Sequence, residues 1–484
     1  MGFHNGWQAW YQAAHDMADH DLIDEAVRAM RQALQMNPEF PDGHLELGLL
    51  LAERGVRGDE PERCFDQAIR LAPDRPEPWF LLGHRLLGRG QVEEAGHCFR
   101  SALEVDPERP ESIAGLARVL LHRGDPAAAL ALSAPLADVA NPHPQVIHAY
   151  ATSCRGMDRP EDAVVALRRV LAESILPSER RQLQLDLGDA LDELGEVDEA
   201  FAAFKGINDQ QEPRFDAQGH RTAVRNAIAA YSADAMARMP CSTRTSGLPV
   251  LIVGLPRSGT ALVERILCDH RQVVGAGEKA TLREIAIHLP HVAGQKGTYY
   301  DCFQQVPVVG YDALADVYLE ALGEVDPQAE RVTDRMAHSF LHLGLAAQLV
   351  PGARVVHCVR DPLDALWSSY RHASRPGRPW AASLESLGHY YLAYQELMAH
   401  WRKALPLSLF EVRYESLVTD PEPVIRDLVR FLGLDWDRSC LDRTPSALHE
   451  VGSPHPGRIH QRSVGRATPY RQHLEPLVQI LENA

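Results

Sequence analysis

Val250-Leu-Ile-Val-Gly-Leu-Pro-Arg-Ser-Gly-Thr260 is the stretch that decides the fold of the C-terminal part of this chain. The four apolar residues at its start predict a fully buried parallel strand, and residues 261–270 continue at helical spacing. Between them, Gly254 to Thr260 predict a tight turn bounded by glycine. A strand, such a turn and a helix direct free backbone N–H groups and the positive end of the helix toward an anion, so the sequence predicts a phosphate-binding loop.

This loop departs from the nucleotide-binding pattern G-x-x-x-x-G-K-[ST] in one respect. Gly254 and Gly259 have the required spacing, and Thr260 supplies the hydroxyl group. No lysine precedes Thr260, and the cation is instead Arg257, in the middle of the loop. We therefore expect the loop to bind a phosphate group other than that of a magnesium–ATP complex.

The N-terminal part of the chain is repetitive. Prolines recur at steps of 35, 34, 35 and 35 residues: Pro38, Pro73, Pro107, Pro142 and Pro177. Alanines keep the same step at Ala33, Ala68 and Ala102. Small residues let two antiparallel helices approach closely, and a proline can begin the next pair because no backbone N–H is needed there.

The stretch Trp79-Phe-Leu-Leu-Gly83 resembles the first-helix signature of the tetratricopeptide repeat, which has this period. We therefore predict an α solenoid of about six tetratricopeptide repeats over residues 5–208. The resemblance implies a superhelix with a concave face that binds a peptide or protein.

Residues 209–247 are predicted to form a connecting helix, at 221–239, and a linker rich in Pro, Ser, Thr and Gly. The remainder, residues 248–484, alternates strands and helices. Further strands are predicted at 272–278, 354–359 and 408–412, and helices at 284–289, 311–322, 339–349, 362–372, 384–404 and 421–432. The alternation implies an α/β P-loop-type domain whose parallel sheet is covered by helices on both faces.

The composition of the chain indicates which binding partners and which cellular compartment to expect. A formal charge of −17 argues against a nucleic-acid partner, although a local arginine cluster could still hold an anionic cofactor. The eight cysteines are scattered, with no C-x-x-C pair, which predicts reduced thiols in a cytosol. The sequence has neither a signal-peptide pattern nor an apolar run approaching the ~18 residues of a membrane span. We expect a cytoplasmic protein that contacts no membrane, and a homodimer is compatible with the sequence.

A second polar cluster follows the next buried strand. Arg360 ends that strand, and Ser368 lies two turns into the following helix. By itself the pair is more typical of an arginine that makes an ion pair with Asp361 or Asp364 at the start of the helix. Together with the phosphate-binding loop, however, the pair resembles the sulfotransferase family.

The resemblance to sulfotransferases implies a donor and the residues that hold it. In that family a Pro-[Arg/Lys]-Ser-Gly-Thr loop holds the 5′-phosphosulfate of 3′-phosphoadenosine 5′-phosphosulfate (PAPS), and a later Arg…Ser pair holds the 3′-phosphate. The donor-binding residues implied here are Pro256, Arg257, Ser258, Gly259, Thr260, Ala261, Arg360, Ser368, Tyr414, Ser463, Gly465 and Arg466. The implied product is 3′-phosphoadenosine 5′-phosphate (PAP), and no metal is expected.

The implied catalytic residues are Glu278, Arg257 and Arg335. Glu278 follows Arg257 by 21 positions, which resembles the tyrosylprotein sulfotransferases, where a glutamate at this place is the proposed base. Arg257 would stabilise the leaving phosphate, because fixed positive charge does most of the catalysis in a loose transition state. The alternative for Glu278 is a solvated loop carboxylate or an ion pair with Lys279 or Arg283.

The order of the two parts, repeats first and transferase second, resembles the bacterial tetratricopeptide-repeat sulfotransferases over essentially the whole chain. We therefore expect transfer of a sulfuryl group to a hydroxyl acceptor, with tyrosine of a peptide or protein gathered by the repeats as the favoured acceptor.

Three residues depart from the family pattern. Ala261 replaces a second threonine of the loop, Arg335 replaces a lysine, and Ala467 replaces an aromatic residue after Ser-Val-Gly-Arg466. They support an alternative function: a repeat scaffold whose transferase domain binds a nucleotide but is inactive. A kinase on the same fold is a third hypothesis, against which the missing loop lysine argues.

Two further groups of residues are candidates for a site. His338 and His342 have the spacing of helical metal ligands, but no third ligand accompanies them, so a metal site is not expected. Tyr390, Tyr391 and Tyr394 follow helical spacing and are expected in the core of their helix, with one of them as a candidate for the acceptor pocket.

Overall fold

The computed structural model describes residues 6–20, 22–54, 59–210, 215–373, 378–441, 459 and 461–483. Among these residues the chain divides into two compact units, the first ending at Glu196 and the second beginning at Val197.

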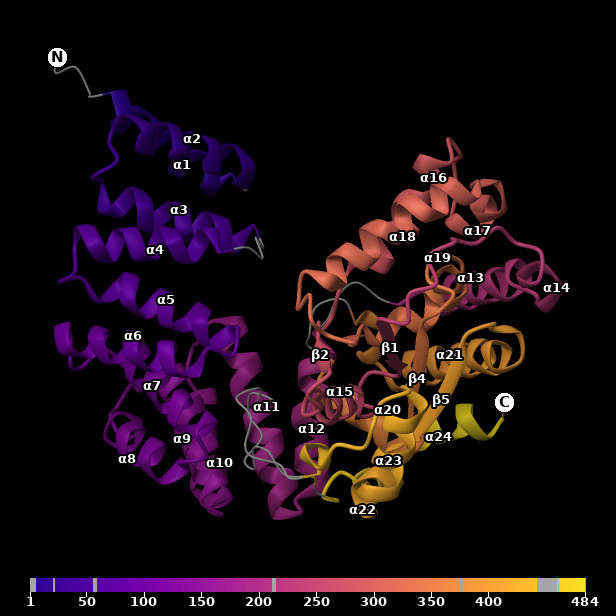
Figure 1. The fold of residues 1–484 in the computed structure, drawn as a ribbon. Coiled ribbons are helices and arrows are strands. Elements are labelled where there is room, and N and C mark those ends of the chain that lie inside the picture. Colours follow the sequence, from indigo (N-terminus) through magenta and orange to yellow (C-terminus); the bar gives the residue numbers. More distant parts are fainter. Residues whose placement is uncertain are drawn as a thin grey trace. The chain divides into compact units, whose positions relative to one another are not determined.

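The first unit is a succession of antiparallel helix pairs (Figure 1). Its helices are α1 (Gly6–Asp19), α2 (Ile23–Met36), α3 (Pro41–Glu53), α4 (Glu60–Leu71), α5 (Pro76–Gly88), α6 (Val92–Val105), α7 (Pro110–His122), α8 (Pro126–Ala137), α9 (Pro144–Gly156), α10 (Pro160–Leu171) and α11 (Pro177–Leu194). Each helix packs against the next, and α7 also packs against α5 and α9. The predicted α solenoid is confirmed.

The sequence predicted that the prolines marking the period begin helices. The structure shows this for only some of them. Pro177 occupies the first position of α11, whereas Pro38, Pro73 and Pro107 lie in the turn before a helix. In those repeats a second proline three residues later begins the helix, where its missing N–H costs no hydrogen bond.

Small and large residues alternate between the paired helices as expected. Phe99 of α6 is fully buried, and its ring lies against Gly83 of α5 and Gly115 of α7. A Cβ atom at Gly115 would lie 2.4 Å from the ring of Phe99. The aromatic ring therefore fills the space that the two glycines leave between neighbouring helices.

Two series of ion pairs recur along the array at the spacing of the repeats. In one series, the arginine lies just after the first helix of a repeat, and its partner is an acidic residue of the preceding repeat. These pairs are Arg54–Asp24, Arg89–Asp59 and Arg123–Glu93. A second series precedes these helices: Arg75–Asp42, Arg109–Glu77 and His143–Glu111. Exposed pairs contribute only about 0–1 kcal/mol each, so these pairs add little to the stability of the array.

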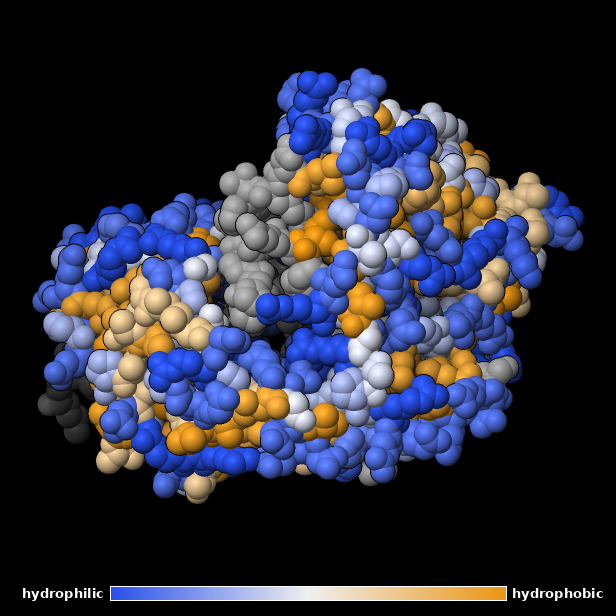
Figure 2. Space-filling view, turned by 90° about the horizontal axis from the view of Figure 1, so that it is seen from below, coloured by the Kyte–Doolittle hydropathy of each residue, from blue (hydrophilic) through white to orange (hydrophobic). Residues whose placement is uncertain are grey.

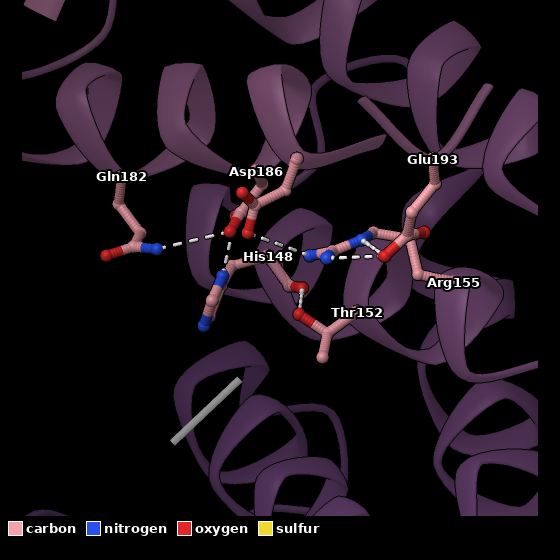
Figure 3. Close-up of polar contacts among 7 residues, drawn as sticks. His148, Thr152, Arg155, Gln182, Asp186 and Glu193 are labelled. Atoms are coloured by element: carbon pink, nitrogen blue, oxygen red, sulfur yellow. Dashed lines mark hydrogen bonds and ion pairs between the residues drawn. The ribbon is translucent and has the colours of Figure 1, made fainter. Parts of the chain in front are cut away.

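A denser polar network joins α9 to α11 (Figure 3). His148 Nδ1 lies 2.6 Å from Asp186 Oδ2, and Gln182 donates to the other oxygen of Asp186. Arg155, whose side chain is 6% exposed, pairs with Glu193 at 2.7 Å and with Asp189 at 3.4 Å. Although burial opposes its charge, these carboxylates raise the pKa of Arg155, so the pair of helices is held by a buried cation.

The second unit is built on a sheet of five parallel strands (Figure 1). The strands are β1 (Pro249–Gly254), β2 (Val273–Gly275), β3 (Arg331–Asp334), β4 (Arg354–Val359) and β5 (Ser408–Arg413), in the order β2-β3-β1-β4-β5. Ile252 of the central strand β1 is in register with Val356 of β4. The predicted α/β fold with a parallel sheet is confirmed.

Helices pack on both faces of this sheet. They are α12 (Val197–Asn208), α13 (Ala217–Ala230), α14 (Ala233–Met236), α15 (Thr260–Cys268), α16 (Thr281–Val292), α17 (Tyr299–Cys302), α18 (Val308–Gly323), α19 (Leu343–Leu349), α20 (Pro362–Arg371), α21 (Leu384–Ala404), α22 (Tyr414–Thr419), α23 (Pro421–Phe431) and α24 (Glu475–Glu482). The short 3₁₀ helices are η1 (Phe303–Gln305), η2 (Ala337–His342), η3 (Pro379–Ala381), η4 (Arg438–Cys440) and η5 (Thr468–Tyr470).

Alternate side chains along each strand lie on opposite faces of the sheet. Val250 and Ile252 of β1 belong to a core with α15 and α23. On the opposite face, Nε2 of His357 in β4 lies 2.6 Å from the hydroxyl oxygen of Tyr394 in α21. Because side chains alternate along a strand, residues buried on both faces read as the continuous apolar run seen in the sequence.

Helix α12, which the sequence assigns to the last repeat, packs in the second unit against α20. Phe201 stacks on Trp367, and Asn208 donates a hydrogen bond to the carbonyl oxygen of Tyr370 at 2.9 Å. His473, near the start of α24, lies 2.7 Å from Asp198. The predicted boundaries at residues 208 and 247 stay predictions.

Three local predictions were wrong. Residues 331–334 form the strand β3, which is absent from the predicted strands. The helix predicted at 339–349 is divided into η2 and α19. The connecting helix predicted at 221–239 is divided into α13 and α14, because the Ser232 hydroxyl accepts from the Ala235 N–H and caps a new helix start.

The exposed surface agrees with the acidic composition. Figure 2 shows one face on which hydrophilic residues dominate and hydrophobic residues form separate patches. Among the described residues, no helix is both long enough and apolar enough to span a bilayer.

We predict that Gly115→Ala destabilises the repeat array by about 1–3 kcal/mol, because the new methyl group would overlap the buried ring of Phe99. This loss exceeds the helix propensity of ~1 kcal/mol that alanine gains over glycine. Urea unfolding followed by circular dichroism measures the change.

Gly88→Ala is the matched control, because a Cβ atom at Gly88 meets nothing within 4 Å. It should leave the array unchanged or stabilise it by up to ~1 kcal/mol. Equal effects of the two substitutions would contradict the packing described for Phe99.

Candidate active site

The loop between β1 and α15 has a backbone that requires glycine at two positions. Gly254 and Gly259 have φ values of +154° and +98°. A Cβ atom on Gly254 would lie 2.5 Å from the Cys358 carbonyl oxygen, and one on Gly259 would lie 2.7 Å from the Tyr414 ring. Arg257 has a φ of +72°, a left-handed conformation that costs a non-glycine residue about 1–2 kcal/mol. Strain of this kind is concentrated at binding sites.

The structure brings the predicted loop and the second polar cluster together. Arg257 Nε donates to the Ser368 hydroxyl at 3.0 Å. Arg360 Nη1 donates to the carbonyl oxygen of Arg257 at 2.8 Å, and its guanidinium lies 4.7 Å from the centre of the Tyr414 ring. Arg360 Nη2 donates to the carbonyl oxygen of Ser463. Five predicted donor-binding residues therefore form one contiguous group at the carboxyl ends of β1 and β4.

Two buried polar atoms of the loop and of this group have no hydrogen-bond partner within the described parts of the chain. They are Ser258 Oγ and Arg360 Nε. An unsatisfied buried group costs about 1–3 kcal/mol, and a bound anion with several oxygen atoms would supply the missing partner. Thr260 begins α15, a helix of nine residues, whose N–H groups and positive end lie at the same loop. The residues present fit a phosphate group.

The C-terminal segment, residues 463–467, is held beside the loop by Asp364, which is 3% exposed. Its carboxylate accepts from the backbone N–H of Gly465 at 2.7 Å and of Ala467 at 2.8 Å. Ala467 is buried, so the small residue that replaces the family's aromatic is packed in the protein. Asp361, which the sequence offered as an ion-pair partner for Arg360, accepts from the Asp364 N–H and caps α20.

The carboxylate of Glu278 is half-exposed and pairs with Arg335, whose Nη1 lies 3.0 Å from Glu278 Oε1. This pairing differs from the sequence alternatives, in which Lys279 or Arg283 was the partner. Arg335 is held in turn by Glu264, with Nε 2.5 Å from Glu264 Oε2. Although burial opposes its charge, the two carboxylates raise the pKa of Arg335.

Glu264 is a site residue that the sequence analysis missed. Its other carboxylate oxygen accepts from the Thr333 hydroxyl at 2.9 Å and from the Gly277 N–H at 3.2 Å. Glu264 therefore joins α15 to the ends of β2 and β3 and fixes the position of Arg335. Its only sequence signal is a glutamate one turn into a helix that follows a phosphate-binding loop.

Asp334, just before Arg335, is fully buried. Burial raises its pKa to about 6, although the Tyr318 hydroxyl at 2.9 Å and the Met336 N–H at 3.2 Å stabilise the charged form. These hydrogen bonds fix the turn that follows β3 and thereby the direction of Arg335.

The two histidines with helical spacing lie in the 3₁₀ helix η2, where residues four apart do not share a face. No group of three potential metal ligands occurs in the described residues. Burial lowers the pKa of both His338 and His342 to about 4. His455 and His460, which the sequence predicts to be solvated or to line the cofactor cleft, lie outside the described residues.

Pro256 is buried and accepts through its carbonyl oxygen from the Ser369 hydroxyl at 3.3 Å. Ala261 lies in the first turn of α15, and Arg466 lies beside Gly465 in the segment held by Asp364. Tyr390, Tyr391 and Tyr394 are buried, as expected.

The fold and this group of residues define an α/β domain with a built anion site at the carboxyl ends of its parallel strands. Residues 249–438 match a family model described as the sulfotransferase family. Residues 11–76, 86–151 and 151–213 match tetratricopeptide-repeat models. The chain therefore carries tetratricopeptide repeats followed by a sulfotransferase-family domain.

Individual relatives are distant. An uncharacterised protein of Aquifex aeolicus is 26% identical over 336 residues, which are 66% of this chain and 44% of that protein. A putative protein-tyrosine sulfotransferase of Caenorhabditis briggsae is 23% identical over 202 residues, 40% of this chain and 68% of its own length. Protein-tyrosine sulfotransferase 1 of Danio rerio is 22% identical over 205 residues, 40% of this chain and 55% of its own length. This chain thus spans less than half of the Aquifex relative.

We predict that His342 makes the second unit less stable in mild acid. Its pKa falls from 6.5 to about 4 on folding, so below about pH 6.5 the unfolded state binds a proton that the folded state does not. Stability therefore decreases as the pH falls from about 6.5 to about 4, by ~1.4 kcal/mol per pH unit from this residue.

The test is urea unfolding of His342→Gln between about pH 5 and about pH 6, where its pH dependence should be shallower than that of the parent by ~1.4 kcal/mol per unit. His291→Gln, which changes an exposed histidine of α16, is the matched control. Parallel pH profiles of the parent and His342→Gln would refute the prediction.

Proposed function

We propose that the chain is a sulfotransferase that moves a sulfuryl group from PAPS to a hydroxyl acceptor, with tyrosine of a peptide or protein as the favoured acceptor. The observation that carries this proposal is the contiguous group of Arg257, Ser368 and Arg360, with a buried Ser258 hydroxyl and Arg360 Nε that lack partners in the described structure. Two cationic side chains in one group match a nucleotide with phosphates at two positions.

The residues that would hold the donor fall into two sets. Ser258, Thr260 and the loop N–H groups would bind the 5′-phosphate end together with Arg257. Arg360 and Ser368 would bind the 3′-phosphate. Gly465 and Arg466, in the segment held by Asp364, would complete the nucleotide side of the site.

When bound, PAPS supplies an activated sulfuryl group: its bond to the phosphate oxygen breaks, a bond to the acceptor oxygen forms, and the electron pair leaves on PAP. Arg257 is a fixed cation within the loop, so it can stabilise the charge on the leaving phosphate. Glu278 can take the proton of the acceptor hydroxyl, and a phenol with a pKa near 10 gives up that proton more readily than an alcohol. Arg335 holds the Glu278 carboxylate in place.

Binding of a peptide or protein by the repeats is part of the same proposal. Tetratricopeptide arrays present a concave surface to extended partners. The curated relatives from Caenorhabditis and Danio are protein-tyrosine sulfotransferases by name, which supports a protein acceptor.

We predict that Glu278→Gln lowers turnover by about 100-fold or more, because glutamine can still accept a hydrogen bond from Arg335 but cannot take a proton. PAP should bind the variant as tightly as the parent, since Glu278 lies outside the donor group. Transfer of sulfur-35 from labelled PAPS to acceptors in a cell extract gives the turnover, and calorimetry gives the affinity for PAP.

Glu284→Gln is the matched control, since Glu284 is an exposed glutamate on α16. Turnover of Glu278→Gln close to that of the parent would remove Glu278 from the mechanism. A parent that binds PAP but labels no acceptor would favour the inactive scaffold over the enzyme.

A further inference from the structure

Four rings in the second unit form what we call the aromatic cluster: His220 at the start of α13, Trp380 of η3, Tyr390 of α21 and His338 of η2. The Trp380 ring stacks on Tyr390 at 4.2 Å with an interplanar angle of 7°. The His220 ring also stacks on Tyr390, at 4.9 Å and 19°. Tyr390 is therefore held by two flat neighbours, which fix the direction of its hydroxyl group.

Two polar atoms of the aromatic cluster lack a hydrogen-bond partner in the parts of the chain that the structure describes. The Tyr390 hydroxyl and His220 Nε2 are buried, and neither has a hydrogen-bond partner among the described residues. Tyr390 is 2% exposed, and burial raises its pKa, so the group is a neutral hydroxyl that can donate and accept. Two unpartnered polar atoms among stacked rings are costly for a purely structural core.

The aromatic cluster adjoins the proposed base through His338. The His338 ring meets Trp380 edge to face at 6.0 Å and lies 6.3 Å from the Tyr390 ring. The Glu278 carboxylate acts electrostatically on the same His338 ring. His338 also follows Arg335, the partner of Glu278, by three residues. The charge of Glu278 thus acts on the aromatic cluster at His338, whereas the donor group is centred on Arg257.

We propose that the aromatic cluster binds the acceptor of the transferase, that this acceptor is a phenol, and that the Tyr390 hydroxyl and His220 Nε2 hold its polar end beside Glu278. The inference rests on the proposed function, because it needs a hydroxyl acceptor at Glu278. A phenol combines a ring that packs among other rings with one hydroxyl, which matches two polar atoms in an aromatic setting. A sugar would bury several hydroxyls, for which the aromatic cluster offers too few partners.

The test is a titration of the full chain with 4-fluorophenol, followed by fluorine NMR, in the presence and absence of PAP. We expect Tyr390→Phe to bind 4-fluorophenol about three- to tenfold more weakly than the parent, as loss of one hydrogen bond predicts. His220→Phe keeps a ring on Tyr390, removes Nε2 and should weaken binding to a similar extent. Fluorobenzene, which has the ring without the hydroxyl, should bind the parent and Tyr390→Phe equally.

Tyr394→Phe is the matched control, because its hydroxyl already has a partner in His357. It should lower stability and leave 4-fluorophenol binding unchanged, whereas Tyr390→Phe should leave the free energy of unfolding unchanged or raise it. Unchanged 4-fluorophenol affinity in both Tyr390→Phe and His220→Phe, or a parent that does not bind 4-fluorophenol, would overturn the inference.

Calorimetry with PAP on the same samples separates the two proposals. PAP binding with no phenol binding would overturn the aromatic cluster as acceptor site and leave the donor site standing. Phenol binding through Tyr390 with no PAP binding would instead overturn the proposed function.

Discussion

The guanidinium of Arg360 joins three segments of the second unit that are far apart in the sequence. It donates to carbonyl oxygens of the loop at Arg257 and of the C-terminal segment at Ser463, and it lies over the ring of Tyr414. That ring in turn lies where a side chain on Gly259 would be. The loop, the strand end and the C-terminal segment are therefore positioned by one cation, whose Nε has no hydrogen-bond partner among the described residues.

Other residues of the site are likewise each held in place by a second side chain. Ser368 accepts from Arg257, and Glu264 holds Arg335, which holds Glu278. Arg257 and Arg360 bring two positive charges into one group, so an acidic protein can keep a local cationic site for an anionic donor. Preorganised charge of this kind is what a transfer with a loose transition state requires.

Sequence reasoning found the parts of the site that lie in contiguous motifs and missed those that depend on long-range contacts. The phosphate-binding loop was predictable because its glycine spacing and apolar strand are adjacent in the chain. The strand β3 was not, since Arg331–Asp334 is a short stretch with charged ends that becomes a strand by pairing with β1 and β2. Glu264 was missed because its partners are 13, 69 and 71 positions away. Likewise, nothing local indicated that Tyr390 would be stacked between His220 and Trp380.

The claim on which the account depends is that the Arg257–Ser368–Arg360 group recognises a nucleotide with phosphates at both the 5′ and 3′ positions. Calorimetric titration with PAP, with 5′-AMP and with magnesium–ATP tests it most directly. We expect PAP to bind without magnesium and about 10- to 100-fold more tightly than 5′-AMP, as charged hydrogen bonds to a second phosphate imply. Magnesium–ATP should bind more weakly than PAP. Equal affinity for PAP and 5′-AMP, or tighter binding of magnesium–ATP, would contradict it.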